Sequence, residues 1–90
     1  MRITFDPKKR EATLGERGID FADAVEVFTG PRLTLTDDRF DYRETRFLTY
    51  GLKNGRLMVV VWTPRRGARH VISMRKCNEK EKRRFAHRLV

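Results

Sequence analysis

The longest apolar run in the chain, Leu57 to Trp62, is rich in Val and predicts a strand that is covered on both faces. Five residues, Pro64 to Ala68, separate this run from a second one, Arg69 to Arg75. Two such runs joined by a short loop with Pro and Gly predict a β-hairpin. No carboxylate lies between Arg56 and Lys76, so the predicted hairpin is strongly basic at both ends.

Alternation along the second run gives its two faces different characters. It places Arg69 and Arg75 together on one face. It places His70 and Met74 on the other face, which we expect helices to cover. Since Arg65 ends the neighbouring strand, we expect several guanidinium groups to converge on the open face, where they would bind phosphate bidentately.

Helix caps and turn residues predict the elements on either side of this hairpin. Sequential hairpins favour antiparallel pairing, and helices with apolar stripes cover a sheet face. The sequence therefore predicts a two-layer α+β fold, formed by residues 1–90 as one domain, with a mainly antiparallel sheet, two N-terminal helices and one C-terminal helix. The expected elements are a strand at 2–5, a helix from Asp6-Pro7 to Arg17 closed by Gly18, a helix from Asp20 ended by Gly30-Pro31, strands at 33–36 and 43–50, a turn at Asn54-Gly55, and a helix capped by Asn78 and Glu81.

Charge narrows the classes of partner. Lys and Arg total 21 against 12 Asp and Glu, a formal charge of +9, which favours binding to polyanions such as nucleic acid. No apolar run approaches the ~20 residues of a membrane helix, and no signal-peptide pattern opens the chain, so we expect a cytoplasmic protein without a membrane partner. One Cys and two His do not make a zinc site, and the aspartates after Thr36 lack the pattern of a calcium loop. The sequence predicts neither a metal nor an organic cofactor.

If the bound phosphate belongs to RNA, the basic cluster suggests cleavage chemistry. Metal-free cleavage needs a base for the ribose 2′-hydroxyl, cations for the charge on phosphorus, and a proton for the leaving oxygen. The positive charge of nearby arginines lowers the pKa of a lysine and so favours its neutral form. Lys9 is therefore our candidate base, with ordinary surface charge as the alternative. His70 and His87 rank below it, since His70 is expected on the covered face and His87 on a terminal helix.

Several short pieces of the sequence follow one another in a characteristic order and spacing. They are Phe5-Asp6-Pro7 with Lys9, Arg17 to Phe21 with Ala24, Val27 and Phe28, Arg46-Phe47, Gly51, Val59 to Val61 with Thr63 and Arg65, and Ile72 to Lys76 followed by Glu81. In these pieces the chain resembles the BrnT family of type II toxin–antitoxin ribonucleases over essentially its whole length. It departs from the family pattern at Phe5, Thr13, Glu16-Arg17 and Phe85.

This resemblance implies a RelE-like fold and an endoribonuclease that arrests translation. It also implies neutralisation by a BrnA-like antitoxin with a DNA-binding part, through which alone the complex would reach its promoter DNA. By position, it implies Lys9, Arg65 and Arg75 as catalytic residues. We expect further RNA contacts from Arg46, Arg66, Arg69 and Lys76. Two alternatives stay open: a basic module that binds RNA or ribosomes without chemistry, and a subunit whose basic surface holds an antitoxin.

Overall fold

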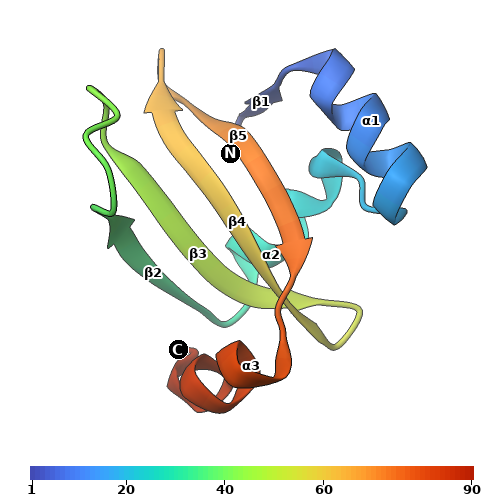
Figure 1. Ribbon diagram of the computed structural model, residues 1–90, viewed down its shortest axis with the longest axis vertical. Helices are drawn as coiled ribbons and strands as arrows, with labels where there is room; N and C mark the ends of the chain where they lie inside the picture. The colour runs from blue at the N-terminus through green and yellow to red at the C-terminus, as the bar shows by residue number, and fades with distance from the viewer.

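A five-stranded sheet in the order β1-β5-β4-β3-β2 forms the centre of the protein, which a computed structural model describes over residues 1–90 (Figure 1). Three α-helices accompany the sheet, so the α+β class is confirmed. The strands are β1 (Ile3–Phe5), β2 (Arg32–Asp37), β3 (Arg46–Lys53), β4 (Arg56–Arg65) and β5 (Ala68–Lys76), and the helices are α1 (Pro7–Arg17), α2 (Ala24–Thr29) and α3 (Glu79–Phe85).

The sheet is mixed, so the prediction of a mainly antiparallel sheet is wrong. The hairpins that link β2 to β5 are antiparallel, as the short connections require. β1, however, pairs in parallel with β5, and Thr4 lies opposite His70. Two strands can pair in parallel only when a long crossover connection joins them. Here α1, α2 and three further strands lie between β1 and β5 along the sequence.

The predicted caps lie where the sequence indicates. Asp6 accepts a hydrogen bond from the Lys8 amide at 2.9 Å and begins α1, and Gly18 ends α1 with a left-handed φ of 67°. Asn78 and Glu81 form a reciprocal capping box that begins α3. The second predicted helix begins at its Asp20 cap, but its first turn, Phe21–Asp23, is a 3₁₀ helix that continues into α2.

Both tight turns of the sheet place two residues in the left-handed region. Asn54 and Gly55 have φ of 50° and 73°, as predicted for the turn between β3 and β4. Between β4 and β5 the loop is shorter than expected, because pairing continues to Arg65 opposite Ala68. The turn therefore contains only residues 66 and 67, with φ of 51° and 75°. The β3 strand begins later than expected, since Arg43 has a φ of 58° and still belongs to the preceding turn.

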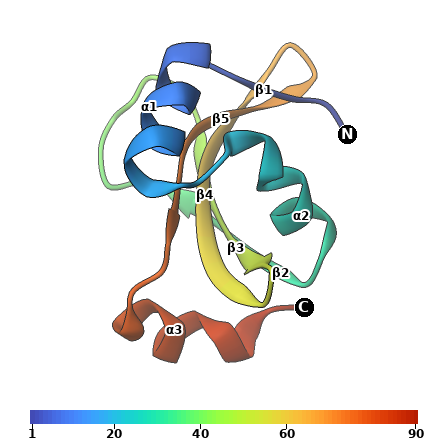
Figure 2. The same cartoon turned by 90° about the vertical axis from the view of Figure 1, so that its right-hand side faces the viewer.

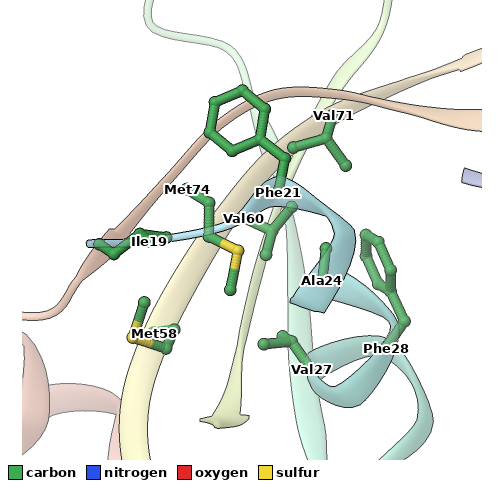
Figure 3. Close-up of a cluster of buried hydrophobic side chains, with 9 residues drawn as sticks. All are labelled: Ile19, Phe21, Ala24, Val27, Phe28, Met58, Val60, Val71 and Met74. Carbon is green, nitrogen blue, oxygen red and sulfur yellow. The ribbon is translucent and has the colours of Figure 1, made fainter. Parts of the chain in front are cut away.

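The sheet has a hydrophobic cluster on each face. On the face toward α2, called here the α2 face, Phe21 and Phe28 pack against the strands, with Met58 and Val60 contributed by β4 (Figure 3). Gly51 allows a close approach, because a Cβ there would lie 2.9 Å from a methyl carbon of α2. The full cluster consists of Ile19, Phe21, Ala24, Val27, Phe28, Met58, Val60, Val71 and Met74.

The opposite face, called here the α3 face, is covered only in part. Phe85 of α3 stacks on Tyr50 with ring centroids 4.2 Å apart, beside Leu57 and Val59 of β4. This contact covers one end of the sheet, where α3 lies in Figure 1. Viewed along the sheet in Figure 2, α2 lies on one side of the strands, while α1 and the loop between β2 and β3 lie on the other. The rest of the α3 face is therefore open and flanked by these two segments.

A β-bulge in β5 changes which side chains share a face. Val61 pairs with Ser73 but the next residue, Trp62, pairs with Val71, so Ile72 is an extra residue. The bulge reverses the alternation on its N-terminal side. Consequently the predicted arrangement of the arginines of β5 on one face is wrong, and so is the prediction that His70 points toward the covered face.

Candidate functional site

Near the turn between β4 and β5, at one end of the sheet, His70 lies close enough to Arg65, Glu44 and Lys9 for their charges to shift its pKa. Arg65 lies on the α3 face because every second residue of β4, from Val59 through Thr63 to Arg65, points to the same side. His70 lies on this face because it pairs with Thr63. Glu44 and Lys9 come from the loop before β3 and from α1. We call Lys9, Glu44, Arg65 and His70 the hairpin-end centre.

Glu44 connects two arginines of this region. Its carboxylate accepts a hydrogen bond from Nε of Arg46 at 3.0 Å and one from Arg65 at 3.3 Å. These two interactions lower the pKa of Glu44, the Arg46 hydrogen bond more strongly. Arg65 remains about half exposed, with a side-chain exposure of 49%. An incoming phosphate could therefore reach Arg65 without displacing a buried ion pair.

His70 is half-buried and fixed by β1. Its Nδ1 lies 2.8 Å from Oγ1 of Thr4, the residue opposite it in the parallel pair. Burial lowers the pKa of His70, and the charges of Arg65 and Lys9 lower it further, while Glu44 and Asp6 act in the opposite direction. The imidazole is therefore neutral near pH 7. When Nδ1–H donates to Thr4, Nε2 keeps a lone pair that can accept a proton.

Lys9 is exposed on the first turns of α1, and its charge acts on His70. The helix cap at Asp6 and the pairing of β1 with β5 bring this side of α1 to the edge of the open face. The sequence led us to choose Lys9 as the candidate base and to expect His70 on the covered face. The signal that this expectation missed is the bulge at Ile72, which turns His70 toward Arg65.

Arg75 does not join the hairpin-end centre. It pairs with Val59 in the sheet, whereas Arg65 lies six positions further along β4, so the two residues are roughly 20 Å apart. Glu81 accepts two hydrogen bonds from the Arg75 guanidinium, both at 2.8 Å. The expected convergence of Arg65 and Arg75 on one phosphate is therefore wrong, although both lie on the α3 face.

Arg75 instead lines a hollow of about 380 Å³ between the sheet and α3. The floor of this hollow is apolar, and three arginines and one glutamate lie around it. Its position next to the stacked Tyr50 and Phe85 rings gives it flat aromatic walls. The lining residues are Leu35, Arg39, Leu48, Tyr50, Val61, Ser73, Arg75, Glu81, Arg84 and Phe85.

The other predicted RNA-binding residues are dispersed. The Arg69 guanidinium lies over the rings of Phe28 and Trp62, 4.7 and 5.0 Å from their centroids, which places it on the α2 face. Arg66 forms part of the turn, where its carbonyl accepts a hydrogen bond from Arg2. Lys76 lines a separate pocket near Ile19. Arg46, in contrast, adjoins the hairpin-end centre through Glu44.

The single thiol is buried, and the acidic side chains do not gather into a cluster with other metal-binding residues. Cys77 is buried beneath α3, and burial raises the pKa of its thiol to about 11. No group of three or more His, Cys, Asp or Glu side chains lies close enough together to hold a metal ion. Every helix is too short or too polar to cross a lipid bilayer.

Comparison with known proteins identifies the family of the chain. Residues 5–81 match a family described as ribonuclease toxin, BrnT, of type II toxin-antitoxin system. No protein with a curated function matches the chain. The match begins at the last residue of β1, includes the other four strands, α1, α2 and the hairpin-end centre, and ends within α3. The chain therefore belongs to the BrnT family of ribonuclease toxins, which act with an antitoxin partner in type II toxin–antitoxin systems.

Proposed function

We propose that the protein is a metal-independent endoribonuclease that cuts RNA at the hairpin-end centre and thereby inhibits translation in the cytoplasm. The observation that carries this proposal is that His70 and the half-exposed Arg65 share the open face near the turn between β4 and β5, where the charge of the exposed Lys9 also acts on His70. Together they supply the proton acceptor and the positive charge that cleavage by a ribose hydroxyl requires.

In this proposal His70 accepts the proton of the 2′-hydroxyl at Nε2. The 2′-oxygen then forms a bond to the adjacent phosphorus, and the bond from phosphorus to the 5′-oxygen of the next nucleotide breaks. Arg65 stabilises the negative charge that develops on the phosphoryl oxygens, and Lys9 donates a proton to the leaving 5′-oxygen. The products are a 2′,3′-cyclic phosphate and a 5′-hydroxyl end, so the charges and atoms balance.

Arg75 acts on a different phosphate of the same strand. Arg75 and Arg65 are roughly 20 Å apart, which is too far for both to contact one phosphodiester group. Val61 and Ser73 line the open face between them. A single strand of RNA that crosses this face would meet Arg65 at one end and Arg75 at the other. Glu81 holds the Arg75 guanidinium in a fixed orientation for that contact.

Membership of the family supports a cognate antitoxin as the protein partner. We propose a BrnA-like antitoxin with a DNA-binding part, so that the complex reaches its promoter through the antitoxin. The RelE-like arrangement of a sheet with an open catalytic face is part of the same proposal. A pull-down with the product of the adjacent gene tests this partner directly.

The experiment for the enzymatic activity mixes purified protein with single-stranded RNA in EDTA. We expect Lys9→Ala and Arg65→Ala to lose most of the cleavage, and Arg75→Ala to weaken it through RNA binding. Lys8→Ala and Arg32→Ala remove one exposed positive charge each outside the centre and serve as matched controls. Equal cleavage by all five variants would refute the proposal. Retention of intact RNA by every protein would indicate the binding module without chemistry.

A further inference from the structure

The loop between β2 and β3 exposes a large aromatic side chain. Phe40 is 70% exposed, more than any other large apolar side chain away from the two chain ends. A ring of this size leaves most of its apolar surface in water, so a ligand that covers it gains free energy. In Figure 2 the loop curls toward the side of the sheet on which α1 lies.

The loop that carries Phe40 is fixed at its base. Asp37 is 5% exposed, and its carboxylate accepts two hydrogen bonds from the Arg39 guanidinium at 2.8 and 2.9 Å. The Tyr42 hydroxyl donates a third hydrogen bond to the same carboxylate at 3.2 Å. Phe40 therefore lies between two residues that share one buried anchor. Its ring is presented to solvent on a constrained loop.

Phe40 is also connected to the hairpin-end centre through continuous contacts. Its ring meets Tyr42 edge to face, with centroids 5.8 Å apart. The Arg46 guanidinium lies 3.9 Å from the centroid of Tyr42. Arg46 in turn shares the carboxylate of Glu44 with Arg65. Two aromatic rings and one guanidinium thus extend the centre outward along the loop.

From this geometry we infer that Phe40, supported by Tyr42 and Arg46, stacks on a nucleobase of the RNA and positions the strand next to Arg65. The inference rests on the proposed function and adds to it a base-binding subsite. Exposed aromatic rings beside positive charge bind single-stranded RNA by stacking, since every base offers a flat face. Along the chain, Arg39 precedes Phe40 and Arg46 follows Tyr42. Their guanidinium groups would hold the phosphates next to the stacked base. Phe40 is in this account a positioning residue.

The test measures the affinity for short single-stranded RNA whose 2′-hydroxyls are methylated, so that it binds but cannot be cut. We expect Phe40→Ala to bind roughly 10-fold more weakly than wild type, and Phe40→Trp to bind at least as well. Val25→Ala is the matched control, because Val25 is also exposed, at 43%, but lies on α2 on the other side of the sheet. With unmodified RNA, Phe40→Ala should raise KM and leave kcat nearly unchanged.

Removal of single bases locates the subsite. An abasic nucleotide at the position that stacks on Phe40 should weaken wild-type binding as much as Phe40→Ala does, and the two changes together should cost no more than either alone. Wild-type affinity for Phe40→Ala in an otherwise active protein would overturn the inference and leave the proposed function intact. If wild-type protein neither binds nor cuts RNA, the proposed function fails and the subsite fails with it.

Discussion

Replacement of Asp37 by Asn should uncouple the loop between β2 and β3 from the sheet. The Asp37 side chain is 1% exposed, and the hydrogen bonds from Arg39 hold the pKa of its carboxyl at about 2, compared with an ordinary value of 3.8. Asn is similar in size but has no negative charge, and its amide group presents donors to the guanidinium donors of Arg39. The substitution therefore removes the anchor without opening a cavity.

The size of the effect follows from the displaced pKa of Asp37. A fall from 3.8 to about 2 corresponds to roughly 2.4 kcal/mol of stability at pH 7, at about 1.36 kcal/mol for each pH unit. The Arg39 side chain is 63% exposed, so solvent weakens the pair, and we expect about 1–2 kcal/mol. In a domain of this size that loss lowers Tm by roughly 5 to 10 °C.

The dependence on pH has a definite sign. Because folding lowers the pKa of Asp37, its contribution is fully present above the ordinary value of 3.8 and is lost as the pH falls through about 2. Thermal unfolding followed by circular dichroism would compare wild type with Asp37→Asn at neutral pH and near pH 3. The gap between the two proteins should narrow at the lower pH. Asp38→Asn, at the neighbouring exposed position, is the control and should differ little from wild type.

Two results would refute the reasoning. One is equal stability of Asp37→Asn and wild type at neutral pH, which would mean that the buried carboxylate adds nothing. The other is a gap that keeps its full size at low pH, which would show that the effect of the substitution is not the loss of charge. Neither outcome depends on whether the protein cuts RNA.

Three further predictions concern packing, reactivity and catalysis. Gly51→Ala should destabilise the protein by about 1–3 kcal/mol, because the new Cβ would lie 3.0 Å from a carbonyl oxygen of α2. Gly15→Ala, on the exposed side of α1, should instead stabilise the protein by about 0.5–1 kcal/mol. Chemical denaturation of both variants checks these opposite signs. Cys77, with its pKa raised to about 11 by burial, should react with iodoacetamide only after unfolding, and rapid labelling of the native protein would contradict its position. The rate of RNA cleavage should fall as the pH is lowered below 6.5, because the pKa of His70 lies below this ordinary value and its neutral form is the base. If the pH profile of His70→Asn were the same as that of wild type, the base would be Lys9 and not His70.

Local features of this fold could be predicted from the sequence because neighbouring residues determine them. Asp6 and Gly18 fix the ends of α1 through hydrogen bonds and dihedral angles within a few residues. The Asn54-Gly55 turn likewise depends on two residues that tolerate positive φ. The order of elements follows from these signals together with the apolar runs.

Features that depend on long-range register could not be predicted in this way. The parallel partner of β1 lies more than sixty residues away, and a three-residue strand carries no pattern that selects it. The bulge at Ile72 adds one residue to β5 without any Gly or Pro to mark it. That single residue decides which side chains form the site, since it places His70 with Arg65 and moves Arg69 to the α2 face.

The ion pair between Arg75 and Glu81 could not be predicted for a related reason. Glu81 is six residues away from Arg75 on the first turn of α3, and the contact forms because α3 begins shortly after the end of β5. The sequence indicates the arginine and the capping glutamate separately. Only the folded chain shows that one carboxylate serves both the helix cap and the guanidinium.

In the proposed mechanism the ribose hydroxyl itself attacks the phosphorus at the hairpin-end centre. The most direct measurement uses an RNA in which the ribose at the mapped cleavage position is replaced by 2′-deoxyribose, with all other nucleotides unchanged. We predict that cleavage at that position disappears, and that the unmodified RNA yields a 2′,3′-cyclic phosphate that depends on Arg65. Cleavage of the deoxy-substituted RNA at the same position and rate would contradict the proposed mechanism.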